Sequence, residues 1–216
     1  MGATDMLLQL SILALTLLMT VIAFSYLQTG TSSRQPKKKD RASAAIQDQT
    51  NRHLTQAAHL LSRAQSSRAH FAKLALAETD AAISLSPRDP SPLILKSQAL
   101  RCLGHVGPAL RALDLALAPP RVRSLPDKER AEALFARAEV KMELNRKRRV
   151  DSAIEDLKEA ARLGGGGAEE ERVWCLLGRC YEWKGMKDEA RWAFEEARKI
   201  RPDCLEAREG LQRLGL

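Results

Sequence analysis

The sequence has few aromatic residues and no recognisable catalytic motif. Phe, Trp and Tyr make up only 4% of its 216 residues, which argues against a β-sandwich, because strands are enriched in aromatic side chains. The four histidines are scattered, and no Walker, HExxH or GxSxG motif occurs. The four glycines at 164–167 lack the Lys-Ser/Thr pair that a phosphate-binding loop needs. The sequence therefore predicts a protein that is not an enzyme and binds no cofactor.

Cysteine is also scarce, with four residues in the chain: Cys102, Cys175, Cys180 and Cys204. Cys175 and Cys180 lie five positions apart, which is not the CxxC spacing of a zinc knuckle or a redox motif. The four cysteines are best interpreted as small, buried apolar side chains in a reducing compartment. We therefore expect no metal site.

Charge is absent from residues 6–27, a run of 22 residues near the N-terminus. As a helix this run would be about 33 Å long, which matches the hydrocarbon thickness of a bilayer. We predict a single transmembrane helix here. A cleaved signal peptide is the alternative, but residues 1–5 contain no Lys or Arg, the run is long for a signal peptide, and only a mediocre cleavage site follows.

Basic residues follow this run, whereas only Asp5 precedes it. Because positive residues beside a membrane helix stay in the cytosol, we predict residues 1–5 outside the cytosol and the C-terminal part inside it, on the endoplasmic reticulum or an organelle outer membrane. Residues 28–55 are predicted to be a basic, flexible linker, whose last part could already be helical. Three lysines could contact anionic lipid headgroups: Lys37, Lys38 and Lys39.

The formal net charge of +8 raises the question of nucleic-acid binding. The densest basic cluster outside the linker is the RKRR sequence at residues 146–149. It has no interleaved aromatic residues and belongs to no known nucleic-acid recognition motif. We interpret this segment as part of a solvated loop, residues 145–151, and expect no nucleic-acid partner.

Helix-forming residues dominate the rest of the chain, and residues 174–202 show a regular pattern that begins W-x2-L-G-x2-Y. This segment resembles the tetratricopeptide repeat, a pair of antiparallel helices. All signature positions of that repeat are filled: Trp174, Leu177, Gly178, Tyr181, Ala190, Phe194, Ala197 and Pro202. Gly178 and Ala190 are small where the two helices would cross, and Gly185 is suited to end the first helix.

Weaker copies of this unit precede it in register. Two series of alanines recur with successive gaps of 34, 44 and 37 residues, where 34 is the length of one tetratricopeptide repeat. We predict an all-α solenoid, residues 56–216, of about four helical hairpins with a C-terminal capping helix, preceded by the transmembrane helix. The predicted hairpins and cap cover residues 56–89, 90–123, 131–167, 171–204 and 205–214.

The resemblance implies a concave groove lined by the first helix of each hairpin, in which a peptide or helix of another protein binds. Residues on the groove-facing side of these helices are the candidate partner contacts. An exposed Trp beside arginines is typical of interaction hot spots, which favours Trp183, Arg172 and Arg179. The full candidate set is Gln98, Arg101, Glu132, Glu139, Arg172, Arg179, Glu182 and Trp183, with Phe135 and Met142 on the same faces.

These features predict a membrane-anchored scaffold that binds partner proteins through its groove. Two alternatives fit the same features, an import receptor of an organelle outer membrane and a docking protein for chaperones. A carboxylate clamp for chaperone tails is not favoured, because only Arg172 matches the basic and amide residues that such a clamp requires.

Overall fold

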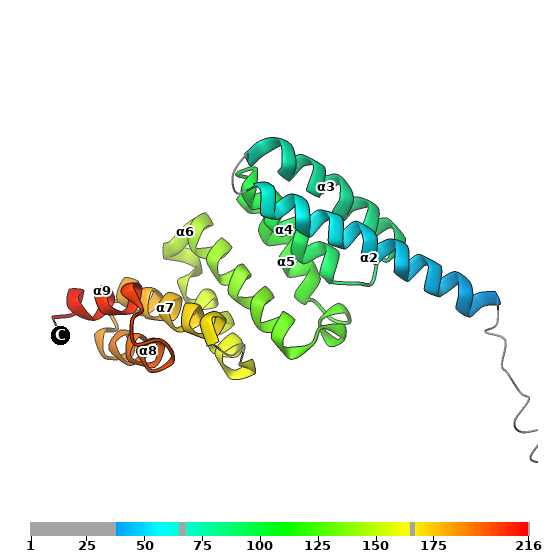
Figure 1. The fold of residues 1–216 in the computed structure, drawn as a ribbon. Coiled ribbons are helices and arrows are strands. Elements are labelled where there is room, and N and C mark those ends of the chain that lie inside the picture. The colour runs from blue at the N-terminus through cyan, green and yellow to red at the C-terminus, as the bar shows by residue number, and fades with distance from the viewer. Residues whose placement is uncertain (1–37, 65–67, 165–166, 216) are drawn as a thin grey trace, which may run out of the picture. The chain divides into compact units, whose positions relative to one another are not determined.

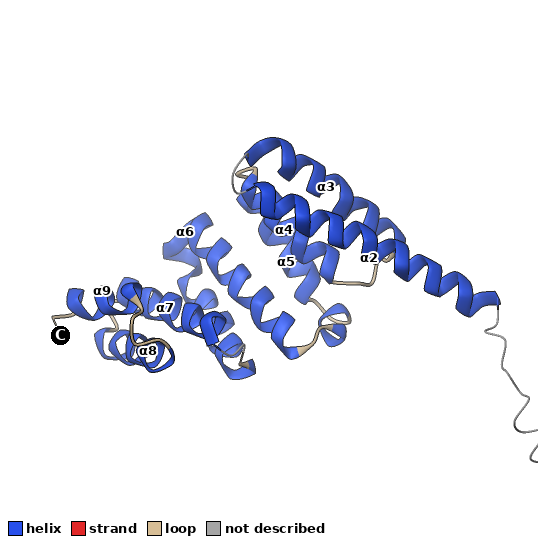
Figure 2. Cartoon of the chain, viewed as in Figure 1, coloured by secondary structure: helices blue, strands red, loops and turns tan. Residues whose placement is uncertain are grey.

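The computed structural model describes residues 38–64, 68–164 and 167–215, and all regular structure in these residues is helical (Figure 2). Residues 46–216 form one compact unit. The helices are α2 (Lys38–Ala64), α3 (Arg68–Leu85), α4 (Ser91–Cys102), α5 (Val106–Leu117), the short 3-10 helix η1 (Arg121–Ser124), α6 (Asp127–Leu163), α7 (Gly167–Lys184), α8 (Lys187–Ile200) and α9 (Leu205–Arg213).

Helices of the 46–216 unit pack mainly against their neighbours in sequence. From α3 to α9, each α-helix lies against the next one, and α7 also contacts α9 (Figure 1). The buried apolar residues form three clusters that follow one another along the stack. Such nearest-neighbour packing defines a solenoid. The predicted all-helical solenoid is therefore confirmed.

The second hairpin, α4 and α5, and the fourth hairpin, α7 and α8, turn in the same way. Each turn contains a glycine in the left-handed conformation. Gly104 follows α4 with φ 79°, and Gly185 follows α7 with φ 76°. In each case the next backbone N–H donates to a carbonyl five residues back, from His105 to Leu100 at 2.8 Å and from Met186 to Tyr181 at 3.0 Å. This is the hydrogen bond of a Schellman cap. The prediction that Gly185 ends a helix is confirmed.

The third hairpin turns without the predicted loop. Residues 146–151 are helical and belong to the second segment of α6, which non-helical backbone angles at Asn145 (φ −162°, ψ 93°) separate from the first segment. The Asn145 side-chain oxygen accepts a hydrogen bond from the Arg148 backbone N–H at 3.2 Å. This is the bond by which an N-cap asparagine starts a helix. The inserted residues therefore lengthen a helix, and the loop interpretation of residues 146–149 was wrong.

The core of the fourth hairpin is built around Phe194, which has no exposed surface. A Cβ atom on Gly178 would lie 2.7 Å from the Phe194 ring, and one on Gly210 of α9 would lie 2.5 Å away. The ring therefore packs directly on two helix backbones, and the capping helix α9 closes over it. The remaining signature residues at Leu177, Tyr181, Ala190 and Ala197 are buried, Trp174 is half-buried and Pro202 is exposed.

The N-terminal part of the chain differs from the prediction in one respect. Helix α2 begins at Lys38, inside the stretch predicted to be a flexible linker. Its later turns, in the predicted first hairpin, bury a helical stripe of apolar residues that includes Ala57, Leu60 and Leu61, whereas residues 41–49 are exposed. Within the described residues, no helix combines the length and apolar character needed to cross a bilayer. The predicted transmembrane helix at 6–27 lies outside them, as does residue 37 of the basic cluster.

Candidate functional site

A groove of about 740 Å³ runs along the first helices of successive hairpins. Helices α2, α4 and α7 and the first segment of α6, residues 127–144, supply nearly all of its lining. Five of the eight candidate contacts line it: Gln98, Arg101, Glu132, Glu139 and Arg172. Their contact with a partner stays a prediction.

The other three candidates lie farther along α7. Arg179, Glu182 and Trp183 line a shallow depression together with Arg213 of α9. A smaller depression of about 160 Å³ joins Arg179 and Trp183 to side chains of α6 that include Glu139 and Met142. Glu139 lines both the large groove and this depression. The candidate residues of three hairpins therefore share one continuous surface.

The large groove has an apolar floor and charged walls. Its floor includes Leu61, Leu95, Phe135 and Val173. Its walls hold five carboxylates and two guanidinium groups: Glu132, Glu139, Glu143, Glu169, Glu170, Arg101 and Arg172. This acidic surplus contrasts with the net charge of +8 of the whole chain.

Both guanidinium groups of the large groove already have partners on α6. Arg101 donates to Glu139 at 2.8 Å and to Glu143 at 2.5 Å. The Arg172 guanidinium lies 4.6 Å from the centre of the Phe135 ring and 3.9 Å from a Glu139 oxygen. Each arginine therefore links its own helix to α6 of the neighbouring hairpin, and less of its positive charge is available to a ligand.

Glu132 is the carboxylate that the groove perturbs most clearly. Burial raises the pKa of Glu132, and repulsion from Glu169 raises it further. Glu169 itself faces Lys128 at 3.4 Å. Lys128 lowers the pKa of Glu132 in part but does not offset this rise, so a further cation placed between Glu132 and Glu169 would stabilise this wall.

At the other end, the candidate residues are paired with the capping helix. Glu182 accepts two hydrogen bonds from Arg213, at 2.9 and 3.1 Å, and Arg179 donates to Glu206 at 3.1 Å. Trp183 is 56% exposed, and the Arg146 guanidinium lies 4.6 Å above its ring. Trp183 is therefore the candidate at this end with the most free surface.

Sequence reasoning missed several groove residues, although a signal for some of them was present. Glu143 follows Glu139 by four positions, which places both on one face of the first segment of α6. Arg146 lies beyond the break at Asn145, and it was missed because residues 145–151 were interpreted as a loop. The contribution of α2 was also missed, because the first hairpin has the weakest repeat pattern.

A second group of charges is buried inside the third hairpin. The Arg137 guanidinium donates to both oxygens of Asp156, at 2.6 and 2.9 Å. The Lys141 ammonium donates to the same carboxylate at 2.7 Å and to the Ser152 carbonyl at 3.0 Å. These bonds join the two segments of α6, so their role is to hold this hairpin closed.

No protein-family model and no curated protein matches the sequence. Solved structures do share its arrangement of helices. PilF of Pseudomonas aeruginosa matches with a TM-score of 0.62 at 17% identity, over 78% of this chain and 70% of PilF. The TPR protein TTC0263 of Thermus thermophilus matches with a TM-score of 0.56 at 21% identity, over 76% of this chain and 80% of its own. The fold is that of the tetratricopeptide-repeat proteins.

A third match supports the same fold. The MamA protein aligns with a TM-score of 0.61 at 16% identity, over 77% of this chain and 81% of MamA. The low identities in all three cases mean that the helical framework is shared while most side chains differ. The groove therefore has to be interpreted from its own residues.

Proposed function

We propose that the protein is a scaffold that binds a segment of another protein in the groove along α2, α4, α6 and α7, and that it performs no catalysis. The observation that carries this proposal is the groove itself, with an apolar floor between acidic walls. An apolar floor gives affinity by burying a hydrophobic face, and charged walls select the partner's charge.

The ligand that fits this surface best is a basic amphipathic helix or extended peptide. Its apolar side chains would cover Leu61, Leu95 and Phe135, and its Lys or Arg side chains would face Glu132 and Glu169. Because the arginines of the walls are already paired with glutamates, they oppose a basic ligand only weakly. An acidic ligand would instead have to displace these pairs.

The membrane anchor over residues 6–27 completes the proposal. The uncharged apolar run and the basic residues after it support a single-pass protein whose repeats lie in the cytosol. Lys37, Lys38 and Lys39 would then lie near anionic lipid headgroups. The anchor would confine the groove to a membrane surface and raise the local concentration of its ligand there.

An import receptor is the second candidate, and the acidic groove favours it specifically. Organelle targeting segments are amphipathic, rich in Arg and poor in acidic residues. That composition complements the surplus of carboxylates in the groove. An adapter and a receptor would use the same groove, and they differ in the membrane on which the protein resides.

Binding is tested with the full-length chain and synthetic peptides in fluorescence anisotropy titrations. The probes are a basic amphipathic peptide, a scrambled peptide of the same composition and an acidic analogue. We expect Glu132→Lys to weaken binding of the basic amphipathic peptide by about tenfold or more, because like charges then face each other. Glu195→Lys makes the same charge change on the exposed surface of α8, outside the groove, and serves as the matched control.

The scaffold proposal fails if Glu132→Lys weakens peptide binding no more than Glu195→Lys does, or if the scrambled and acidic probes bind as well as the basic amphipathic one.

The anchor is tested separately by carbonate extraction of membranes. Full-length protein should stay in the pellet, and a Leu15→Lys/Leu18→Lys variant should move to the supernatant, because a charge at the centre of a bilayer helix costs about 3 kcal/mol.

A further inference from the structure

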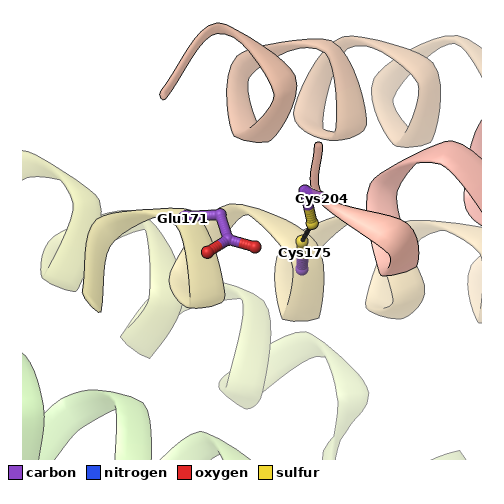
Figure 3. A group of neighbouring side chains, drawn as sticks. All are labelled: Glu171, Cys175 and Cys204. Atoms are coloured by element: carbon purple, nitrogen blue, oxygen red, sulfur yellow. Dashed lines mark hydrogen bonds between the residues drawn. The ribbon is translucent and has the colours of Figure 1, made fainter. Parts of the chain in front are cut away.

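Three potential metal ligands converge between α7 and the start of α9. Glu171 and Cys175 lie four residues apart on α7, so their side chains share one helical face. Cys204 is the N-cap residue of α9, and its sulfur lies 3.4 Å from that of Cys175. A carboxylate oxygen of Glu171 and the two sulfurs all lie within 4.8 Å of one another. Figure 3 shows one Glu171 oxygen directed along the helix toward Cys175, with Cys204 facing it.

The carboxylate in this cluster is buried and only half satisfied. Glu171 is 3% exposed. Its Oε1 accepts a hydrogen bond from Arg201 at 2.7 Å, whereas its Oε2 is buried with no hydrogen-bond partner. A buried carboxylate oxygen without a partner is costly, so its presence calls for a ligand.

We propose that Glu171, Cys175 and Cys204 bind a thiophilic divalent cation of the zinc class. Two sulfurs bound to one tetrahedral Zn²⁺ at about 2.3 Å lie about 3.8 Å apart, close to the separation in the structure. Two thiolates with one carboxylate favour zinc over magnesium or calcium, which prefer oxygen ligands. Three protein ligands leave one coordination position for a water molecule.

The surrounding residues fit this assignment. Two thiolates, one carboxylate, the Arg201 guanidinium and a divalent cation together carry no net charge, which suits a buried site. Arg201 contacts the other carboxylate oxygen of Glu171 and thereby orients this side chain toward the metal, as outer-shell partners of metal sites do. A metal here would fasten the capping helix α9 to α7. The site lies in the core beneath the cap and does not depend on what the groove binds.

The proposal is tested by metal titration of the full-length chain, purified with its thiols reduced and free of metal. Zn²⁺ is titrated in competition with a chromophoric chelator, and Co²⁺ reports thiolate ligation through its charge-transfer absorption. We expect one equivalent of either metal to bind. One equivalent of Zn²⁺ should also raise the melting temperature, because binding to the folded state alone stabilises it.

Cys204→Ser is the decisive variant, since serine can keep the N-cap hydrogen bond that the Cys204 sulfur accepts from the Ala207 backbone N–H. We expect it to weaken Zn²⁺ binding by about 100-fold or more, and Glu171→Gln to weaken it by about tenfold or more, with helical content retained in both. Cys180→Ala is the matched control, because Cys180 is a buried cysteine of the same helix that does not belong to the cluster. This variant should bind Zn²⁺ as the wild type does.

Three results would overturn the assignment. The first is the absence of stoichiometric Zn²⁺ binding by the folded, reduced chain. The second is equal Zn²⁺ affinity in wild type and Cys204→Ser. The third is a Cys175–Cys204 disulfide in protein that is acid-quenched directly from cells, because oxidised sulfurs cannot serve as thiolate ligands.

Discussion

The second and fourth hairpins fill the same core position with different side chains. Leu113 and Phe194 each lie four residues after a buried alanine of the repeat pattern, and neither has any exposed surface. The phenyl ring belongs to a large cluster that extends through α6, α7, α8 and α9. Leu113 belongs to a small cluster with Leu100, Leu110 and Val140. The repeat geometry therefore accepts cores of different size.

The partner positions compensate for this difference in volume. Gly178 and Gly210 leave room for the Phe194 ring, which contacts their backbones directly. The position equivalent to Gly178 in the second hairpin is Ser97, whose buried hydroxyl donates to the Ile94 carbonyl at 2.6 Å. A larger ring goes with a smaller partner, as close packing requires. Signature glycines are therefore needed where a bulky residue faces them.

Truncating the two equivalent side chains should give the largest effects. We expect Phe194→Ala to lower the free energy of unfolding by about 3–5 kcal/mol and Leu113→Ala by about 2–4 kcal/mol, because larger side chains leave larger cavities. Urea unfolding followed by circular dichroism measures both. A larger loss for Leu113→Ala than for Phe194→Ala would contradict the expectation that the larger side chain leaves the larger cavity.

The third hairpin, between these two, depends on buried charge. Asp156→Ala should lower the free energy of unfolding by about 3 kcal/mol, because the buried Lys141 ammonium would lose its carboxylate partner and Arg137 would keep only its longer contact with Asp114. Asp114→Ala is the matched control, since this carboxylate is more exposed and contacts Arg137 at 3.4 Å. Its effect should stay below about 1 kcal/mol. Similar losses in both variants would show that burial of the pair is not what matters.

A glycine-to-alanine substitution should lower the stability of the fold in the fourth hairpin, but leave it unchanged or raise it in the second. Gly178→Ala should destabilise the fold by about 1–3 kcal/mol, because its Cβ would overlap the Phe194 ring. Gly107→Ala in α5 meets no atom closer than Arg111 at 4.0 Å. That substitution should be neutral or stabilise by up to about 1 kcal/mol, through higher helix propensity. Thermal unfolding of both variants checks the contrast, and destabilisation by Gly107→Ala would break it.

The smallest effect is expected at the groove wall. Because burial raises the pKa of Glu132 in the folded chain, the folded state binds a proton more readily than the unfolded state. Ionised Glu132 therefore lowers stability at pH 7, and this cost disappears as pH falls through the raised pKa. Glu132→Gln should be more stable than wild type at pH 7 by less than about 0.5 kcal/mol and equal to it near pH 4. Urea unfolding at both pH values tests this. A gain in stability for Glu132→Gln that is larger near pH 4 than at pH 7 would contradict this prediction.

Much of the fold was predictable because the tetratricopeptide pattern is local. Spacings of three and four residues place Leu177 and Tyr181 on one helical face, and Gly185 can end a helix without any tertiary contact. These features depend only on residues that lie close together in the sequence. The same locality explains the error at residues 145–151, where an insertion was interpreted as a loop although Asn145 is a good helix N-cap.

The candidate groove was predictable only in part. The faces of the first helices follow from helical register, so Gln98, Glu132 and Arg172 could be assigned to one surface. The pairing of Arg179 and Glu182 with the capping helix could not be predicted, because nothing in their own segment specifies which residues of α9 face them. Ion pairs between helices depend on how those helices are packed.

The sequence by itself determined that the chain forms paired helices, where the last pair turns and which face of its first helix is buried, since these properties depend on periodicity over a few residues. Only the tertiary structure decided that Glu171, Cys175 and Cys204 meet, and that Gly210 leaves room for Phe194. The cluster joins Cys204 at the start of α9 to two residues of α7, and the Gly210–Phe194 contact joins α9 to α8. Their distance in space depends on the packing of the whole stack, which spacing along the chain does not encode.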